Sequence, residues 1–330
     1  MHEFLYQLPK IELHLHIEGS LEPELMFKLA TRNNIELPYA TVEEVQSAYQ
    51  FDDLQGFLHL YYQGMNVLRT KQDFYDLAMD YFKRAREEGV VHIDMHFDPQ
   101  AHLQRGVPLE VVMEGLLQAK GEAEAALDLS VGMIMAFLRD RPADEALNVF
   151  EQAAPYWKFL DAIGLDSAEQ NNPPAKFKAL FERAKEVGLV RVAHAGEEGP
   201  ADYIAEALDV LDVQRIDHGV RCLESKSVVQ RLRDEQVVLT VCPLSNVSLK
   251  VVDTLAEHPL PRLLEAGLKV TISSDDPAYF GGGLLTNHTA CAEAFCWDRE
   301  IFRQLNRNAL EAAFVDEARR NELMQRLARA

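Results

Sequence analysis

Residues 10–16 read Lys-Ile-Glu-Leu-His-Leu-His, a short segment that alternates apolar and polar side chains and ends in two histidines. Seven more short apolar segments each lead into a polar cluster, and helical spacing follows most of them: residues 90–97, 129–137, 159–165, 189–194, 215–218, 237–242 and 269–273. Several are near-continuous runs of Val, Ile and Leu, which is typical of parallel strands covered on both faces. These alternations predict a (β/α)8 TIM-type barrel, forming one domain over residues 1–330.

One connection is too long for this pattern. About 70 residues separate Gly19 from Gly89, whereas a bare βα unit needs roughly 30 in total. Helical spacing relates the large apolar residues of this segment, which are Leu54, Phe57, Leu58, Tyr61, Tyr62, Met65 and Leu68. We therefore predict a helical insertion at about residues 20–88, over the carboxyl end of the first strand. Such an insertion either extends the core or covers the substrate as a lid.

The composition excludes several classes of protein. The 330 residues include 33 Lys and Arg against 53 Asp and Glu, and a net charge of −20 disfavours binding to nucleic acid or to anionic membranes. No apolar run approaches the roughly 18 residues of a membrane span, and the N-terminus lacks the pattern of a secretory signal. The four cysteines form no Cys-x-x-Cys pair. We expect them to be reduced thiols of a cytoplasmic protein.

Polar side chains gather where the predicted strands end. Histidines 14 and 16 share one face of the first strand, because side chains alternate along a strand, and this face points into the barrel mouth. The fifth strand ends in His-Ala-Gly-Glu at 194–197, the sixth in Asp-His-Gly at 217–219, and the eighth in Ser-Ser-Asp-Asp-Pro at 273–277. In barrels of this kind catalytic residues lie at the carboxyl ends of the strands.

These strand ends predict a metal site. Three imidazoles and a carboxylate suit a divalent first-row ion, most simply Zn²⁺, with one position left for water. The predicted ligands are His14, His16, His194 and Asp275. Taken singly, each feature has another explanation. A His-x-His pair on a strand is often a hydrogen-bonded pair without a metal, and an Asp-Asp pair before proline is usually part of a turn. Their joint placement at strand ends favours the metal site.

Other candidate clusters are weaker. His92, His96 and His102 surround the end of the second strand without a second ligand set, and we interpret them as packing or supporting residues. Cys242-Pro243 matches half of the zinc signature of cytidine-type deaminases, but no second cysteine and no His-x-Glu element accompany it, which excludes that class. We interpret Ser245 and Asn246 as capping residues of the next helix.

Five ordered motifs resemble those of the adenosine/adenine deaminase family: residues 14–20 (HLHIEGS), 194–197 (HAGE), 217–219 (DHG), 242–246 (CPLSN) and 274–277 (SDDP). The resemblance runs from Leu8 past Gly283. Relatives with two metals usually bridge them with a carboxylated lysine at the end of the fourth strand. Residues 164–169 read GLDSAE and contain no lysine, so the resemblance implies one Zn²⁺ per chain.

Within the family, the sequence is most similar to the adenine deaminase branch, which acts on the free base. It has Ile17-Glu18 where adenosine deaminases have Leu-Asp, Glu169 where they have glycine, and Asp217 where they have glycine. The resemblance implies that Asp276, Glu169 and Gly196 contact the substrate. Glu169 could accept the imidazole N–H of adenine and occupy the space that a ribose needs. Adenosine lacks this N–H, so it would leave a buried carboxylate unpaired, which is costly.

The resemblance also implies a reaction, the hydrolysis of adenine to hypoxanthine and ammonia in purine salvage. A metal-activated water attacks the carbon that bears the amino group, while Glu197 protonates the adjacent ring nitrogen. His218 orients the water, and Asp275 binds the metal and takes the proton of the water. Alternatively, Glu197 interacts with a helix N-terminus and His218 is structural.

Other functions remain open. Adenosine deaminase is the main alternative and uses the same site. A nucleotide deaminase is disfavoured because Arg221 stands alone where a phosphate needs a cationic cluster. A non-catalytic purine or metal binder should have lost Glu197 or a ligand, and none is missing. The sequence does not indicate an oligomeric state.

Overall fold

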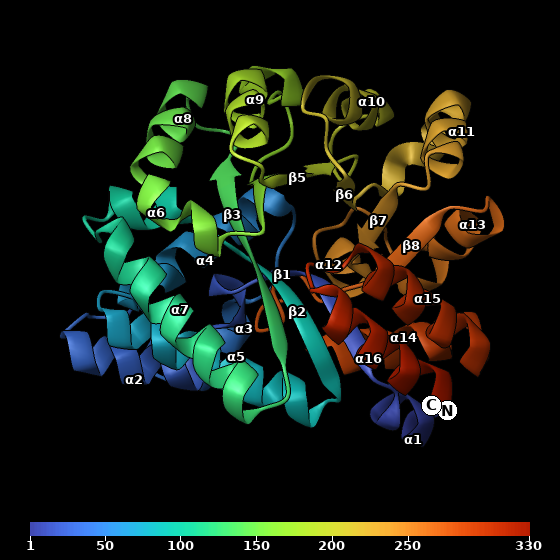
Figure 1. The fold of residues 1–330 in the computed structure, drawn as a ribbon. Helices are drawn as coiled ribbons and strands as arrows, with labels where there is room; N and C mark the ends of the chain where they lie inside the picture. Colours follow the sequence, from blue (N-terminus) through green and yellow to red (C-terminus); the bar gives the residue numbers. More distant parts are fainter.

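The computed structural model describes residues 1–330 and contains one eight-stranded parallel sheet whose order follows the sequence from β1 to β8 (Figure 1). The strands are β1 (Lys10–His16), β2 (Val90–Phe97), β3 (Ser130–Leu138), β4 (Ala162–Asp166), β5 (Val190–Ala195), β6 (Arg215–His218), β7 (Val238–Val241) and β8 (Lys269–Ile272). Helices lie between successive strands and surround the sheet (Figure 1). The predicted (β/α)8 barrel is confirmed.

The predicted strand boundaries are accurate except at β4. The bounds of β1, β2 and β6 are those read from the sequence, but β4 begins at Ala162 instead of Phe159. Residues Ala154–Phe159 form a 3-10 helix, and the side chain of Phe159 is 43% exposed on its surface. Phe159 lengthened the apolar run in the sequence, so the strand was predicted to begin too early, although Phe159 does not enter the sheet.

The ring closes between β8 and β1 through a single bridge, which joins Leu15 and Asp275. The backbone N–H of His16 donates to the Asp275 carbonyl at 2.9 Å, and the Asp275 N–H donates to the His14 carbonyl at 3.1 Å. Asp275 has a φ of +66°, which turns the chain sharply after β8. Closing the barrel thus places Asp275 beside both histidines of β1.

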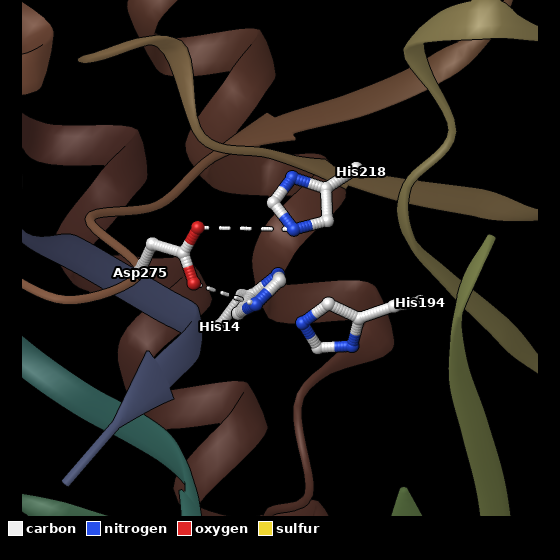
Figure 2. A group of neighbouring side chains, drawn as sticks. All are labelled: His14, His194, His218 and Asp275. Atoms are coloured by element: carbon white, nitrogen blue, oxygen red, sulfur yellow. Dashed lines mark ion pairs between the residues drawn. The ribbon is translucent and has the colours of Figure 1, made fainter. Parts of the chain in front are cut away.

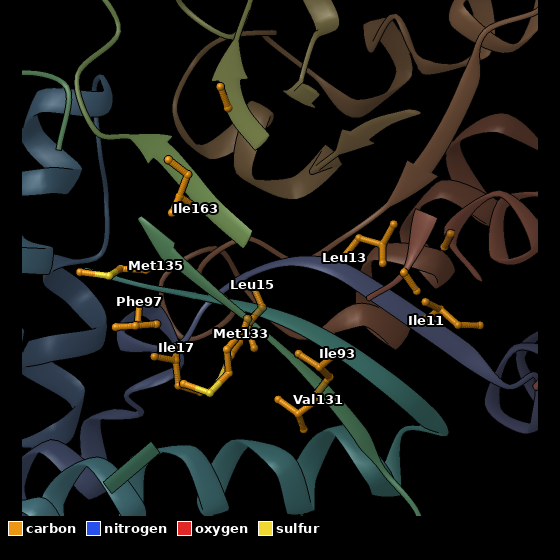
Figure 3. Packing of buried hydrophobic residues seen from close by; sticks show 14 of the residues in the cluster. Ile11, Leu13, Leu15, Ile17, Ile93, Phe97, Val131, Met133, Met135 and Ile163 are labelled. Carbon is orange, nitrogen blue, oxygen red and sulfur yellow. The ribbon is translucent and has the colours of Figure 1, made fainter. Parts of the chain in front are cut away.

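Both faces of the sheet are covered, which explains the apolar strands. Every residue of β1 is buried. Its odd-numbered residues pack into the main hydrophobic core, while Glu12, His14 and His16 occupy the alternate positions. Figure 3 shows this core across β1 to β4, with Ile11, Leu13, Leu15, Ile93, Phe97, Val131, Met133 and Ile163 among the labelled side chains.

The outer layer consists mainly of amphipathic helices. After β2 come α6 (Pro99–Gln104) and α7 (Leu109–Ala126), followed by α8 (Ala143–Gln152), α9 (Lys178–Glu186), α10 (Ala201–Val210), α11 (Lys226–Asp234), α12 (Pro243–Ser248) and α13 (Leu260–Glu265). The chain begins with α1 (His2–Gln7) and ends with α14 (Leu284–Phe295), α15 (Arg299–Ala312) and α16 (Glu317–Arg329). None of the helices is both long and apolar enough to span a membrane.

The long connection between β1 and β2 is helical. It contains α2 (Pro23–Asn33), α3 (Val42–Ala48), α4 (Leu54–Gly64) and α5 (Lys71–Glu87). Asp53 caps α4 by accepting the Gly56 N–H, and a capping box starts α5. Whereas α2 and α5 contribute to the main core, α4 forms a second apolar cluster with Tyr279 and Phe280 from the loop after β8. Helix α4 therefore covers the carboxyl ends of the strands.

Candidate metal and active site

A pocket of about 390 Å³, including the solvent space at its mouth, lies at the carboxyl ends of the strands. Its floor is polar and includes His16, His194, Glu197 and His218. Its roof is apolar and comes from α4, with Leu54, Phe57 and Leu58. The strand-end residues that the sequence singled out thus meet under the helical insertion.

Four donor atoms of the predicted ligands converge within this floor. The Nε2 atoms of His14 and His16 are 3.3 Å apart, and those of His16 and His194 are 3.2 Å apart. The Asp275 Oδ1 atom lies 3.2 Å from His14 Nε2 and 3.5 Å from His16 Nε2. Figure 2 shows His14, His194 and Asp275 with His218, whose donor atoms also lie within 4.8 Å of one another.

These distances suit a divalent metal ion. Zn²⁺ binds His nitrogen and carboxylate oxygen at about 2.0–2.1 Å, so neighbouring donors around an ion with four protein ligands and one position left for water lie about 2.9–3.6 Å apart. The four separations given above, 3.2–3.5 Å, match this requirement, whereas His194 and Asp275 make no contact within 4.0 Å. All four side chains are buried. This donor set can hold a divalent ion and leaves His218 at its edge.

Asp217 lies beneath the histidines, and the sequence did not predict this role. Its Oδ1 atom accepts a hydrogen bond from Thr240 at 2.8 Å and lies 3.9 Å from His14 Nδ1. Its Oδ2 atom lies 3.3 Å from His96 Nε2 and 3.7 Å from His194 Nδ1. A carboxylate behind metal-binding histidines orients their rings. The position of Asp217 directly before His218 at a strand end was the available signal.

Glu197 and His218 face each other in the pocket. The Glu197 Oε1 atom lies 3.6 Å from His218 Nε2, and neither atom has a hydrogen-bond partner. Burial, and after it the nearby Asp275 carboxylate, raise the pKa of Glu197 well above its usual range. Burial lowers the pKa of His218 to about 4. Burial thus favours the protonated carboxyl group of Glu197 and the neutral imidazole of His218.

Glu197 is not an N-terminal residue of the following helix. Helix α10 begins at Ala201, four residues further along the chain, and the Glu197 side chain is buried in the pocket. The alternative in which Glu197 serves only the helix dipole does not describe this geometry.

The interpretation of Ser245 and Asn246 as capping residues is wrong. Helix α12 begins at Pro243, and its N-cap residue Cys242 makes no side-chain hydrogen bond. Both residues lie inside the helix, and the amide nitrogen of Asn246 reaches Nδ1 of His218 at 3.4 Å. The sequence did not reveal this contact, because Asn246 lies in α12 whereas His218 ends a different element, strand β6.

Glu169 occupies a different place from the one expected of a substrate contact. It does not line the pocket, and its carboxylate accepts four backbone N–H groups at 2.8–3.0 Å, from residues 196, 197, 198 and 199. Gly196 likewise lies outside the pocket, and its carbonyl accepts the Arg221 N–H. Three of these N–H groups donate to Oε2 and one to Oε1, so the carboxylate is directed at the backbone of this loop, outside the pocket. The carboxylate instead fixes the loop that carries Glu197.

Asp276 lines the pocket and is packed tightly against the loop after β1. Burial, and after it the charge of Asp275, raise the pKa of Asp276 well above its usual range. Asp98 and Asp166 line the pocket too, without a sequence motif that indicated it. Glu18 instead accepts hydrogen bonds from His102 at 2.7 Å and from the Asp98 N–H at 3.0 Å. Three carboxyl groups therefore reach the pocket besides Glu197 and Asp275.

The remaining histidines behave as supporting residues. His92 contacts Asp94 and Ser130 at 2.8 and 2.9 Å. The ring of His96 stacks on that of His16 with centroids 5.0 Å apart. Their interpretation as packing or supporting residues is confirmed.

Comparison with known proteins places the chain among deaminases. Residues 9–330 match the family model described as adenosine deaminase. A Rhodospirillum rubrum protein named adenine deaminase is 54% identical over 325 residues, covering 98% of this chain and 97% of that protein. A Hahella chejuensis protein of the same name is 53% identical over 327 residues, covering 99% and 98%. The crystal structure of adenine deaminase from Arthrobacter aurescens matches with a TM-score of 0.96 and 51% identity over 98% of both chains.

Proposed function

The chain belongs to the adenosine deaminase family, and from that premise we propose that it is an adenine deaminase, which hydrolyses adenine to hypoxanthine and ammonia. The observation that carries the proposal is the meeting of Glu197 and His218 with four convergent metal donors in one small pocket. The two relatives and the neighbouring structure that bear the name adenine deaminase support the free base as substrate.

We assign one Zn²⁺ per chain to His14, His16, His194 and Asp275, because their spacing and donor types suit it. When bound, the ion supplies a water that is nucleophilic at neutral pH, by lowering its pKa to about 7. Thr240, which donates to Asp217, lies 3.0 Å from Nδ1 of His14 and fixes that ring, while Asp217 itself lies 3.7 Å from Nδ1 of His194. The rest of the chemistry belongs to side chains around the pocket.

Glu197 acts as the general acid. The carbon that bears the amino group becomes electrophilic once the neighbouring ring nitrogen is protonated, and Glu197 donates that proton. Burial raises its pKa well above the usual range and so favours the protonated carboxyl group that this role requires. The four N–H groups that Glu169 accepts hold the Glu197 loop in place during this transfer.

Asp275 and His218 act on the attacking water. The Oδ2 atom of Asp275 lies 3.7 Å from His218 Nε2, so both groups can address one oxygen between them. Asp275 takes one proton of the water and passes it to the amino group, which leaves as ammonia, and the remaining hydroxyl proton returns to Glu197 as the carbonyl forms. His218 orients the oxygen and stabilises its developing charge.

Asp276 and the roof of the pocket orient the purine. Asp276 faces the imidazole-side ring nitrogen. The two form a hydrogen bond when either the carboxyl group or the nitrogen carries the proton. Leu54, Phe57 and Leu58 of α4 cover the rings and exclude water. In this proposal residues 1–330 form one deaminase domain, and the insertion at residues 20–88 supplies its roof.

The four free cysteines support a reducing, cytoplasmic location, since none forms a disulfide. The proposed partner is a small purine base, and the reaction belongs to purine salvage. The net charge of −20 disfavours a nucleic-acid partner.

The test is ammonia release from purified protein supplied with adenine and adenosine in parallel, before and after chelation of metal. Turnover of adenine alone, lost on chelation and restored by Zn²⁺, is the expected result. Equal or greater turnover of adenosine would retain the site and overturn the choice of substrate. No ammonia from either compound with metal present would overturn the proposed function.

A further inference from the structure

A chain of three hydrogen bonds connects a backbone amide at the start of α13 to His218 in the pocket. The Leu260 N–H donates to His258 Nδ1 at 3.0 Å. His258 Nε2 lies 3.2 Å from the amide oxygen of Asn246, and the Asn246 amide nitrogen lies 3.4 Å from His218 Nδ1. The side chains of all three linking residues are buried. None of these contacts follows from a sequence motif.

The direction of each hydrogen bond follows from its fixed end. A backbone N–H can only donate, so His258 Nδ1 must accept and the proton of its neutral ring is on Nε2. His258 Nε2 therefore donates to the Asn246 oxygen. The other end of that amide is the NH2 group, which donates to His218 Nδ1. His218 Nδ1 is an acceptor, and the proton of the neutral ring is on Nε2.

The protonated nitrogen faces the reacting groups. His218 Nε2 is buried without a partner, 3.6 Å from Glu197 Oε1 and 3.7 Å from Asp275 Oδ2. A nitrogen that carries a proton can donate a hydrogen bond but cannot accept a proton. In this tautomer His218 can stabilise negative charge on the oxygen of an attacking water, whereas it cannot be the base.

We propose that Asn246 and His258 are positioning residues that hold His218 as its Nε2–H tautomer. His218 is thereby a hydrogen-bond donor in the reaction, and the proton of the water goes to Asp275. The catalytic part of this inference rests on the proposed adenine deaminase function. The tautomer itself does not, because it is a property of the free protein.

A second Asn–His pair in the same chain supplies a matched control. The Asn306 amide nitrogen lies 3.2 Å from Nε2 of His288, whose Nδ1 donates to the Leu284 carbonyl at 2.9 Å. Both residues are buried, and neither lines the pocket. Asn306→Asp therefore makes the same chemical change beside a buried histidine without touching the reacting groups.

The tautomer can be measured directly. Full-length protein with ¹⁵N-labelled histidine is examined by long-range ¹H–¹⁵N correlation in the zinc-loaded and metal-free forms, with His218→Gln identifying the His218 signals. We expect an unprotonated Nδ1 and a protonated Nε2. In Asn246→Asp at about pH 9, where an imidazole beside a carboxylate is largely neutral, we expect the proton to move to Nδ1. A protonated Nδ1 in the unaltered protein would overturn the proposal, whether or not adenine is hydrolysed.

Kinetics separates a positioning role from a structural one. Asn246→Asp is expected to lower kcat for adenine on the order of 10²-fold, with KM within about threefold, since a donor to the transition state is lost. Asn306→Asp should leave kcat and the His218 tautomer unchanged. His258→Phe, one step further from the pocket, should give both tautomers of His218 and a kcat loss of about tenfold. Equal losses of kcat in Asn306→Asp and Asn246→Asp, or a normal kcat in both Asn246→Asp and His258→Phe, would overturn the proposal.

Discussion

Gly19 and Asp276 are packed so closely that no side chain fits between them. A Cβ atom on Gly19 would lie 2.6 Å from the Cβ of Asp276 and as close or closer to its carboxyl group. The backbone of Gly19 also accepts the Ala278 N–H at 3.0 Å, so the two loops are joined in register. The glycine of the first motif therefore sets the position of a pocket carboxyl group that lies more than 250 residues away in the sequence.

Gly19→Ala should displace Asp276 and weaken the binding of adenine. A misplacement of about 1 Å can cost on the order of 10²-fold in kcat/KM, and we expect the larger part of that loss in KM. Steady-state kinetics and calorimetric titration with hypoxanthine measure the effect. Gly121→Ala is the control, because Gly121 lies on the exposed face of α7 with no atom within 4 Å of an added Cβ. Unchanged KM in Gly19→Ala would show that Asp276 does not hold the base.

Glu169→Gln should slow the reaction without changing the choice between adenine and adenosine. In the native protein, backbone N–H groups donate to the Glu169 carboxylate. The glutamine side chain would place an NH2 group against some of these donors, so the loop carrying Glu197 would shift. We expect a loss of about 2 kcal/mol in the free energy of unfolding and at least a tenfold lower kcat. Asp161→Asn serves as the control, since Asp161 accepts only the Met133 N–H on β3, away from the pocket. A changed ratio of adenine to adenosine turnover would instead return Glu169 to a role in substrate recognition.

Removal of metal should lower the thermal stability of the protein. An ion that binds only the folded state stabilises it by about 4 kcal/mol when its concentration is a thousand times its Kd. We expect chelation to lower Tm by several degrees and added Zn²⁺ to restore it. His16→Ala removes one of the four convergent donors, so its Tm should respond little to either treatment. An equal response in this variant would place the ion elsewhere.

Buried neutral histidines should weaken the fold at acidic pH. Burial lowers the pKa of His288 to about 3, whereas the unfolded chain has the ordinary value of 6.5. As pH falls below 6.5 the unfolded state binds a proton that the folded state does not bind until about pH 3, so stability falls over this window. Urea unfolding of His288→Gln should show a pH slope shallower by about 1.4 kcal/mol per unit. His59→Gln, at an exposed histidine, is the control, and an equal slope change there would contradict the assignment.

The sequence was most informative where one strand determines the outcome. The alternation in β1 indicated that His14 and His16 share a face, and the positions of His194 and Asp275 at strand ends indicated that these residues would meet them. In a barrel the carboxyl ends of all strands lie at one face, so residues far apart in the sequence could be predicted to form one site.

The sequence was less informative about contacts between loops. The resemblance to the adenine deaminase branch predicted Glu169 as a substrate contact, but the direction of its side chain depends on the turn at residues 167–169, where Ser167 has a φ of +69°. The Asn246–His258 pair depends on how α12 packs beside the start of α13. Neither arrangement produces a periodic pattern or a motif, since both arise only after the strands have placed the loops.

The bridge between Leu15 and Asp275 closes the barrel and also positions one of the four proposed metal ligands. A protein cut between β7 and β8 would divide the four donors between two fragments, three on the longer piece and Asp275 on the shorter one. Catalysis by the mixed fragments would then report that the ring had reassembled. The same joint limits evolutionary change, because an insertion that loosens β8 from β1 alters the ligand shell at once.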